Sequence, residues 1–435
     1  MLFSEDAQLR DVSEMLCMFA LALKGTIAQL VEQRTENPCV PGSNPGGTTT
    51  EAAAKQPFFV DICWTMNGDE LNSHDWQEAL HLSKPDRVAW IHENCLDQEL
   101  LGHYRTKLLT SCTDLCGELG LEGGEPLKTW LQVENLLQIF KDWGLTRSSV
   151  VVTTGGGALS DAVGFAASIW KRGIRLIHIP TTPLSAVDAA WGGKTGINWG
   201  GAKNQLGTFA EPLAVHIDAQ WMRTLSPRHF RAGLAEVAKH AFLNLEAFDD
   251  LCAHTLSWPP QNKEEFDLWS TLFVKSSNVK RQIVADDPEE QGVRCILNLG
   301  HTLGHAVEAY TSGTSEPWLH GEAVALGLHF ALFEISHGVW TMGNCQELSH
   351  EQAKKLSAIL HTQVPLPQNW SFTAEELWNY MAHDKKNVGN EIRDVAWRGV
   401  GHILWPVHWK KKSFEATWSA FVRSWEKFPQ RATTP

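Results

Sequence analysis

Two histidines lie four residues apart in a segment whose apolar spacing predicts a helix. They are His301 and His305, in the stretch "NLGHTLGHAVEAY" from Asn298 to Tyr310. Side chains at positions i and i+4 share one face of a helix, so two imidazoles at this spacing could hold one metal ion. The residue after His301 is Thr302, which excludes the HExxH pattern of zinc proteases.

Further candidate metal ligands lie on either side of this pair. His320 begins the strongly helical stretch "HGEAVALG", and Glu236 lies in "GLAEVAKH". Two imidazoles and one carboxylate with an open coordination position form a common catalytic zinc site. The spacing leaves open which two of His301, His305 and His320 bind, and each histidine taken singly is more simply a structural residue.

A run of glycines follows one predicted strand. The stretch "SSVVVTTGGG" ends with Gly155, Gly156 and Gly157, and a helical pattern begins directly after them. Glycines at such a turn let backbone amides approach a pyrophosphate, and a helix N-terminus favours its negative charge. The spacing differs from G-x-G-x-x-G, so a tight turn without any ligand is the competing interpretation.

The segment from Asp188 to Phe209 combines glycines with cationic and amide side chains. Lys194, Lys203 and Asn204 stand among these glycines, and apolar residues are few. Lysines in glycine-rich turns bind phosphate as point charges. We therefore expect a loop shaped around a charged ligand, with a solvated surface loop as the alternative.

Other polar residues could face the same cleft. Lys280, Arg294 and Asn298 recur through "VKRQIVADDPEEQGVRCILN", and Lys385 and Lys386 follow in "HDKKN". Either stretch by itself is more typical of a solvated face.

The elements that must position these residues change in kind near Ser226. Before it, short apolar strands alternate with amphipathic helices, and such alternation indicates βαβ units and a mostly parallel sheet. The predicted strands cover residues 87–94, 148–157, 175–182 and 213–218, and one predicted helix covers 125–144. After Ser226 nearly every periodic segment is helical, apart from a candidate strand pair at 394–406. We predict a Rossmann-like α/β domain at residues 51–224, followed by an all-α domain at 225–435.

Composition excludes several classes of function. The chain has 435 residues, of which 43% are apolar and 20% charged, with a net charge of -13. This acidic balance argues against nucleic acid or an anionic membrane as partner. No apolar run reaches the roughly 20 residues of a membrane helix. The nine cysteines show no paired spacing, which favours reduced thiols and a cytoplasmic location.

The first fifty residues differ from the rest of the chain. The stretch "AQLVEQRTENPCVPGSNPGGTTT" clusters Pro, Gly, Asn and Thr without hydrophobic periodicity, which is typical of loop or disorder. It also resembles the peptide obtained by translating a transfer-RNA gene. We predict that residues 1–50 are a disordered or spurious extension without function.

Taken together, the motifs resemble the 3-dehydroquinate synthase family, over roughly Arg87 to Pro406. They occur in the family's order as "GGGALSDAVGFAA", "IPTTPLSAVDAAWGGKTGIN", "GAKNQLGTF", "GLAEVAKH", "GVRCILNLGHTLGHAVEA", "LHGEAVALG" and "HDKKN". The resemblance implies a Rossmann-like domain followed by an all-α domain, in agreement with the pattern of elements. It also implies tightly bound NAD, one divalent metal (zinc, or cobalt) and a homodimer.

The resemblance assigns roles to individual residues. The metal ligands would be Glu236, His301 and His320, and His305 would face the substrate. The NAD side of the pocket would comprise Glu93, Asn94, Glu125, Lys128, Gly155, Gly156, Gly157, Asp161, Thr181, Thr182, Asp188, Lys194 and Lys203. The residues around the substrate would be Lys194, Lys203, Asn204, Lys239, Lys280, Arg294, Asn298, His305 and one of Lys385 and Lys386.

The implied reaction converts 3-deoxy-D-arabino-heptulosonate 7-phosphate to 3-dehydroquinate and phosphate, in the shikimate pathway. It comprises transient oxidation by NAD, β-elimination of phosphate, re-reduction and an intramolecular aldol closure. Holding one flexible intermediate through several steps is mainly an orientation effect. One departure concerns the end of the first strand, where "HEN" places His92 at a position that carries Asp in many members.

Three alternatives compete with this interpretation. A sister sugar phosphate cyclase would share the fold, NAD and metal but act on sedoheptulose 7-phosphate. A metal-dependent polyol dehydrogenase would release NADH and would not need a lysine-rich phosphate pocket. A degenerate scaffold would bind no stoichiometric metal.

Overall fold

The computed structural model describes residues 74–112, 114–253, 258–340, 350–368, 370–382 and 392–425. All of these residues belong to one compact unit. The expectation for residues 1–50, and the two lysines Lys385 and Lys386, therefore lie outside the described residues.

A five-stranded parallel sheet, in the order β2-β1-β3-β4-β7, carries the first half of the site. Its strands are β1 (Val88–Glu93), β2 (Leu115–Leu121), β3 (Val150–Gly155), β4 (Arg175–Pro180) and β7 (Ala214–Val215). The central strand β3 is buried along its whole length, as parallel strands covered on both faces require. The predicted parallel sheet is confirmed, and β2 is an additional strand that the sequence pattern did not reveal.

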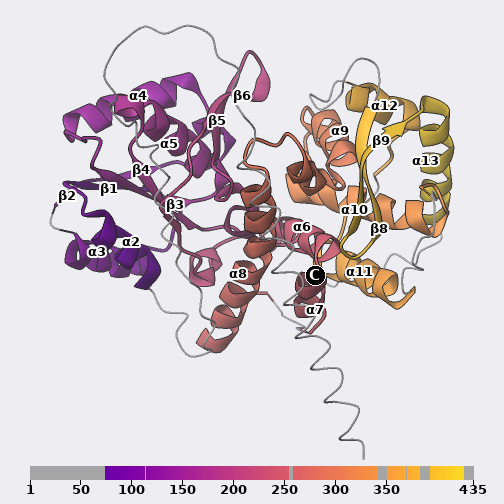
Figure 1. The fold of residues 1–435 in the computed structure, drawn as a ribbon, viewed down its shortest axis with the longest axis horizontal. Coiled ribbons are helices and arrows are strands. Elements are labelled where there is room, and N and C mark those ends of the chain that lie inside the picture. The colour runs from indigo at the N-terminus through magenta and orange to yellow at the C-terminus, as the bar shows by residue number, and fades with distance from the viewer. Residues whose placement is uncertain are drawn as a thin grey trace, which may run out of the picture. The chain divides into compact units, whose positions relative to one another are not determined.

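Helices cover both faces of this sheet (Figure 1). Val88 and Trp90 point to the face covered by α2 (His74–Ser83) and α3 (Gln98–Ser111). Ala89 and Ile91 point to the opposite face, covered by α4 (Trp130–Asp142) and α5 (Gly157–Ile169). Successive strand residues alternate between the two faces, so each strand supplies both cores. The helix predicted for 125–144 is shorter, because Thr129 caps α4 and a separate 3-10 turn, η1 (Glu125–Leu127), precedes it.

The glycine-rich segment after Asp188 is an antiparallel hairpin, which corrects the expectation of a loop. Strands β5 (Lys194–Trp199) and β6 (Ala202–Phe209) pair with each other alone among the described strands. Gly200 and Gly201 connect them with φ angles of 61° and 80°. Two consecutive positive φ angles make a tight two-residue hairpin turn, which glycine adopts most readily. The expectation missed this because glycine was taken as loop-forming along the whole segment.

The second half of the described chain is mainly helical. Its helices are α6 (Pro227–Leu243), α7 (Leu245–Ala253), α8 (Lys263–Asp286), α9 (His301–Thr311), α10 (His320–Ser336), α11 (His350–Gln363), α12 (Ala374–Ala382) and α13 (Lys411–Trp425). Helix α6 is buried from Ala232 to Leu243 and contacts α7, α8, α10 and α11. Short turns η3 (Ser185–Ala189), η4 (Ala219–Met222) and η5 (Val293–Asn298) precede β5, α6 and α9.

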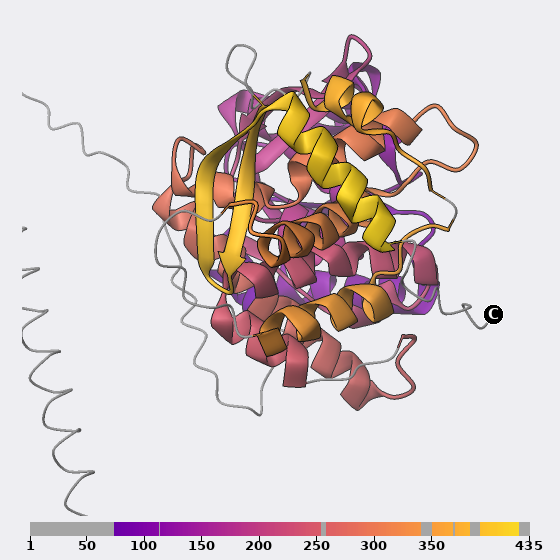
Figure 2. The ribbon, with the colours of Figure 1, turned by 90° about the vertical axis from the view of Figure 1, so that its right-hand side faces the viewer.

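A strand pair interrupts the helical part. Strands β8 (Ile392–Gly399) and β9 (His402–Trp409) form the hairpin that the sequence suggested near 394–406. Figure 2 shows this yellow hairpin and the equally yellow α13 on the face turned to the viewer. Several tryptophans fill the core between them, including Trp409 and Trp418.

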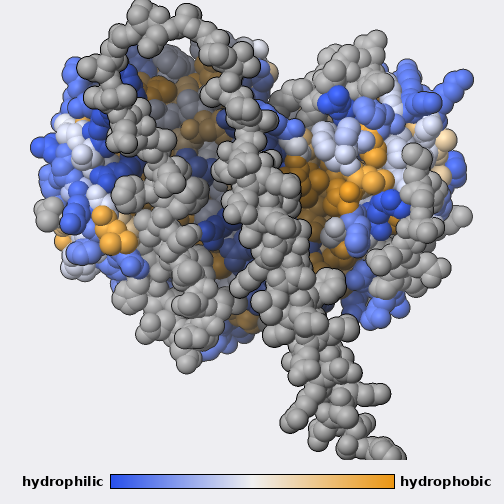
Figure 3. All heavy atoms as spheres, in the orientation of Figure 1, coloured by the Kyte–Doolittle hydropathy of each residue, from blue (hydrophilic) through white to orange (hydrophobic). Residues whose placement is uncertain are grey.

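Much of the described surface visible in Figure 3 is hydrophilic, as the acidic composition leads one to expect. Among the described helices, none combines the length and the apolar character that crossing a bilayer requires.

Candidate metal and substrate site

Three helices bring the candidate metal ligands together. Glu236 lies in the buried middle of α6, His301 is the first residue of α9, and His320 is the first residue of α10. The Nε2 atoms of His301 and His320 lie 3.3 and 3.5 Å from Oε1 of Glu236. One donor atom from each residue lies within 4.8 Å of the other two. Of the three histidines left open by spacing, these two share the carboxylate.

Close backbone packing sets this spacing. Helix α10 crosses α6 at Gly321, where an added Cβ would collide with the backbone carbonyl of Ala232. It crosses the start of α9 at Gly327, where an added Cβ would collide with the backbone of Gly300. Glycine is required at both positions because the main chains themselves are in contact.

Glu236 is fully buried and electrostatically unusual. No described residue makes a well-aligned hydrogen bond to either of its carboxylate oxygens, although Oε2 forms an ion pair with the ammonium of Lys239. Burial alone would raise the pKa of Glu236, but the charges of Lys239 and His301 bring it well below its usual value. A buried, ionised carboxylate with unsatisfied oxygens beside two imidazoles is a donor set that suits a divalent metal such as zinc.

A contact at the second ring nitrogen, Nδ1, orients each imidazole. Nδ1 of His301 lies 3.1 Å from the backbone oxygen of Leu299, and Nδ1 of His320 lies 3.1 Å from Oε2 of Glu308. Such partners fix the tautomer that leaves Nε2 available to a metal. Burial and the charge of Lys239 lower the pKa of His301 to about 4. For His320 burial acts in the same direction, but the neighbouring carboxylates of Glu236 and Glu308 outweigh it and raise the pKa to about 10.

A second group of potential ligands shares Glu236. Asp188 and His240 also place donor atoms within 4.8 Å of it and of each other. Two ammonium groups already contact the carboxylates there, since Lys280 Nζ lies 2.9 Å from Oδ1 of Asp188 and Lys239 pairs with Glu236. Because the ammonium of Lys280 already neutralises Asp188, the group of Glu236, His301 and His320 remains the better metal site.

His305 lies beside the metal group without sharing the carboxylate. Its ring centroid is 5.5 Å from that of His301 and 6.1 Å from that of His320. Its side chain is half-buried, one helical turn after the first ligand. This position suits a group that contacts a substrate held at the metal.

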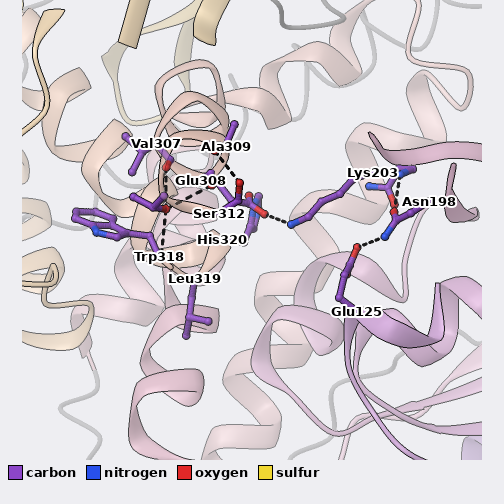
Figure 4. A network of polar contacts seen from close by, with 12 residues as sticks. Glu125, Asn198, Lys203, Val307, Glu308, Ala309, Ser312, Trp318, Leu319 and His320 are labelled. Carbon is purple, nitrogen blue, oxygen red and sulfur yellow. Dashed lines mark hydrogen bonds and ion pairs between the residues drawn. The ribbon is translucent and has the colours of Figure 1, made fainter. Parts of the chain in front are cut away.

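Glu308 is a residue of this site that sequence reasoning missed. It lies on α9, and its carboxylate contacts Nδ1 of His320 and, at 2.6 Å, Nζ of Lys203 on β6 (Figure 4). The signal was present, because His301, His305 and Glu308 follow i, i+4, i+7 spacing on one helix face.

The remaining cations of the substrate side are also paired with carboxylates or carbonyls. Lys194 at the start of β5 pairs with Glu290, whose other oxygen lies 3.2 Å from Nδ2 of Asn298. Arg294 is buried and donates to the backbone oxygen of Gly192 at 3.0 Å. Glu290 was also missed, because its charged segment carries no periodic pattern. Lys194, Arg294 and Asn298 thus lie around one carboxylate, that of Glu290.

The glycine turn connects β3 to α5. Gly155 ends the strand, Gly156 is the N-cap, and Gly157 begins the helix, which has no side-chain cap. The amide of Gly156 donates to Oε1 of Glu93 at 3.2 Å, and burial raises the pKa of that carboxyl. Uncapped amides at a helix N-terminus suit an anionic phosphate, as the sequence suggested.

The other predicted cofactor-side residues surround this turn. Thr181 donates its backbone amide to Gly155, and Thr182 accepts from the amide of Ser185. Lys128 is buried and donates to Oδ2 of Asp161 at 2.6 Å and to Oδ1 of Asn204.

Two more of the predicted cofactor-side residues, Asn94 and Glu125, have polar partners. Asn94 donates to Glu122 at 2.9 Å, and Glu125 accepts from Asn198 at 2.7 Å (Figure 4). His92, at the position of departure, lies 3.2 Å from Oε1 of Glu118, which also pairs with Arg105. His92 therefore contacts a neighbouring carboxylate, and Glu93 is the acidic side chain that lies at the glycine turn.

A chain of polar contacts links the two ends of the site. Lys128 joins α5 to Asn204 on β6, and the preceding residue of that strand, Lys203, joins β6 to Glu308 on α9. Glu308 in turn contacts His320 of the metal group. A dinucleotide at the glycine turn and a metal at the histidines would thus lie at opposite ends of one polar cluster, an arrangement suited to redox chemistry on an anionic substrate.

Sequence comparisons agree over most of the chain. Residues 118–232 match the model of the 3-dehydroquinate synthase N-terminal family, and residues 233–387 match that of the C-terminal family. A 3-dehydroquinate synthase from Helicobacter pylori (strain HPAG1) is 37% identical over 282 residues, which are 65% of this chain and 77% of the relative. One from Gloeobacter violaceus is 37% identical over 309 residues, which are 70% of this chain and 82% of the relative.

Solved structures share the fold at lower identity. A 2-epi-5-epi-valiolone synthase from Streptomyces hygroscopicus, with NAD+ and Zn2+ bound, superposes with a TM-score of 0.64 at 24% identity, covering 78% of this chain and 91% of that one. A 2-deoxy-scyllo-inosose synthase complexed with carbaglucose-6-phosphate, NAD+ and Co2+ gives 0.62 at 22% identity, covering 78% and 93%. Because two family models in sequence order cover more than half of the chain and the Helicobacter relative is aligned over three quarters of its length, this chain belongs to the 3-dehydroquinate synthase family.

Proposed function

We propose that the chain is a 3-dehydroquinate synthase, which converts 3-deoxy-D-arabino-heptulosonate 7-phosphate to 3-dehydroquinate with loss of phosphate. The observation that carries this proposal is the convergence of Glu236, His301 and His320 beside a cluster of cations, in a chain of this family. The metal group suits polarisation of substrate hydroxyls, and the cations suit a substrate with both a carboxylate and a phosphate.

The donor atoms suit the two cofactors of the proposal. Glu236, His301 and His320 would hold the divalent metal, since the buried oxygens of Glu236 have no well-aligned hydrogen bond from the described residues and both imidazoles turn Nε2 toward Oε1. The uncapped N-terminus of α5 would receive the pyrophosphate of NAD. When bound, NAD supplies a reversible hydride acceptor and the metal acts as a Lewis acid.

The protein's own contribution is to hold the substrate. Lys194 and Lys203 are half-exposed on the hairpin, so their ammonium groups can exchange Glu290 and Glu308 for substrate anions. Asn298 shares Glu290 with Lys194, and would be released with it toward the same anion. Lys280 keeps Asp188 ionised, since its charge outweighs burial and lowers the pKa of that carboxyl. Several charged contacts at once restrict a flexible sugar acid to one reactive conformation.

His305 is the group we propose for proton handling near the metal. Its ring lies one turn after His301 and within 6.1 Å of the ring of His320, so it can reach a hydroxyl of a bound substrate. Imidazole is the side chain whose ordinary pKa allows it to hold or release a proton near neutral pH.

The sister reaction on sedoheptulose 7-phosphate is the second candidate. It is favoured by the two solved sugar phosphate cyclases that share this fold, whose names denote other carbocycles. Arg294 and Asn298 distinguish the candidates, because their cluster offers a place for a carboxylate that sedoheptulose 7-phosphate lacks.

Three further expectations, on location, oligomeric state and domain boundaries, belong to the same proposal. We propose a cytoplasmic homodimer, and we propose that residues 51–224 and 225–435 correspond to the cofactor-binding and metal-binding domains. The change from parallel sheet to helices after η4 supports that boundary. Analytical ultracentrifugation of the purified chain tests the dimer.

The deciding experiment measures inorganic phosphate released by zinc-loaded protein with catalytic NAD. Release from the heptulosonate phosphate alone, abolished by a chelator and without accumulation of NADH, would support the proposal. Release from sedoheptulose 7-phosphate would favour the sister cyclase, and bulk NADH formation would favour a polyol dehydrogenase. Glu236→Gln should lose zinc affinity by more than about 100-fold. The exposed Glu264→Gln on α8 is the matched control, with unchanged zinc content.

A further inference from the structure

Glu308 uses its two carboxylate oxygens for two different parts of the protein. Oε2 lies 3.1 Å from Nδ1 of His320 at the start of α10, and Oε1 lies 2.6 Å from Nζ of Lys203 on β6 (Figure 4). The side chain of Glu308 is 20% exposed, whereas that of Lys203 is 56% exposed. One carboxylate therefore joins a mostly buried imidazole to a mostly exposed cation.

We propose that Glu308 is a positioning residue, which orients His320 toward the metal and links that ligand to the β5–β6 hairpin through Lys203. This inference rests on the proposed metal site. It adds that metal binding and the position of the hairpin depend on each other, through one side chain that takes no part in coordination.

Glu308 determines the orientation of His320 because either ring nitrogen of an imidazole could otherwise face the metal. Oε2 of Glu308 accepts from Nδ1–H, and the opposite nitrogen, Nε2, then faces Oε1 of Glu236 at 3.5 Å. A carboxylate behind a ligating histidine fixes both the tautomer and the ring plane, and its loss typically weakens metal binding by 10- to 100-fold. His301 has a backbone oxygen in this role, so Glu308 is the ligand-orienting group that a single substitution can remove.

The part of the hairpin near Lys203 depends on the same carboxylate because core packing holds mainly the other strand. The hairpin is a separate two-stranded sheet in which β5 is buried at Thr195–Ile197 and packs against α5, whereas β6 is exposed over its first four residues. A two-stranded hairpin is marginally stable by itself, so contacts to the rest of the protein decide where it lies. Asn204 is held by Lys128, and the adjacent Lys203 is held by Glu308.

The two contacts of Glu308 share one rigid carboxylate group, so the position of one oxygen determines that of the other. If the metal holds His320 in one orientation, Glu308 is held with it, and the partner of Lys203 becomes fixed. By thermodynamic reciprocity, fixing the hairpin should in turn favour the metal-binding orientation of His320.

The test measures zinc affinity by competition with a chromophoric chelator, and backbone hydrogen exchange of residues 194–209 with and without zinc. Glu308→Ala should weaken zinc binding by about 10- to 100-fold, and Glu308→Gln by less, because the amide oxygen can still accept from His320. Zinc should slow exchange in the hairpin of the parent protein, and much less in Glu308→Ala and Lys203→Met. Glu264→Gln should behave as the parent in both measurements.

Two results would overturn the inference. Unchanged zinc affinity in both folded Glu308 variants would remove the orienting role, and unchanged protection of the hairpin in Lys203→Met would remove the link. Circular dichroism shows whether Glu308→Ala folds, and Glu308→Gln carries the test if it does not. If the parent protein itself binds no zinc, the proposed metal site fails first, and the inference falls with it.

Discussion

The helical part of the site and the hairpin part both use lysine–carboxylate pairs, but in opposite surroundings. On α6 and α8, the side chains of Lys239 and Lys280 are 1% and 9% exposed. On β5 and β6, those of Lys194 and Lys203 are 50% and 56% exposed. The buried lysines keep Glu236 and Asp188 ionised, whereas the exposed lysines can exchange their partners. The same pair of residue types thus fixes charge in one region and, in the function that we propose, receives a ligand in the other.

The largest effect is expected from Lys239→Met, which keeps the length of the side chain but removes its charge. Glu236 would then be buried with less compensation, and removing one partner of a buried pair costs roughly 3–5 kcal/mol. Urea unfolding of the zinc-free protein measures this loss, which bound zinc should reduce. Lys355→Met, at an exposed pair with Glu351 on α11, is the control. A loss no greater than that of the control would show that the buried pair does not contribute to stability.

A slightly smaller effect on stability is expected from a buried histidine in the parallel sheet. His178 on β4 is buried against Thr153, and burial lowers its pKa from 6.5 to about 4. Between these values the unfolded chain binds more protons than the folded chain. The stabilisation is therefore complete above pH 6.5 and is lost as the pH falls toward 4, by about 3 kcal/mol at most.

His178→Gln should flatten that pH dependence, measured by urea unfolding at several values between pH 7 and pH 4. The exposed His402→Gln on β9 is the control. A parent-like slope in His178→Gln would mean that other buried groups account for the loss at acidic pH.

The turn of the hairpin should respond more weakly. Gly201 has a φ of 80° and open space around a hypothetical Cβ, so Gly201→Ala adds backbone strain without a collision. We expect a cost of about 1–2 kcal/mol, confined to the hairpin and measured as faster hydrogen exchange there. Gly313 also has open space but no positive φ, and Gly313→Ala should leave exchange in the hairpin unchanged.

The smallest effect on stability is expected from Lys203→Met, the exposed counterpart of Lys239→Met. Exposed pairs contribute at most about 1 kcal/mol, so the unfolding free energy should hardly change. The KM for the phosphorylated substrate should nevertheless rise, because an anion-binding cation is lost. A large loss of stability with an unchanged KM would reverse the contrast between the two regions.

How far the sequence predicts each region follows the same division. Buried strands such as β3 and β4 are predicted by their continuous apolar runs. The candidate metal ligands lie in helices whose apolar residues recur with strong periodicity. The hairpin was expected as a loop, because glycines at its turn and along its strands hide the alternation of β6. Its two-glycine turn at Gly200 and Gly201 was the missed local signal.

The missed site residues are both carboxylates that hold cations. Glu308 could have been found by following the helix face of His301 for one more turn. Glu290 could not, because it stands in an irregular segment with a positive φ of 59°, and its contacts to Lys194 and Asn298 arise only from the tertiary fold. Periodicity reports which face a residue occupies, but not which partner from a distant segment will meet it.

The contact of α10 with α6 and α9 at Gly321 and Gly327 has a consequence for how this site can change over time. Where main chains touch, the separation of the helices no longer depends on which apolar side chains fill the cores around them. Substitutions in those cores can therefore accumulate and alter stability while the three donor positions keep their spacing. The geometry of the metal group is therefore little affected by changes in the surrounding apolar residues. It is sensitive at Gly321 and Gly327, where the side chain must remain a hydrogen atom.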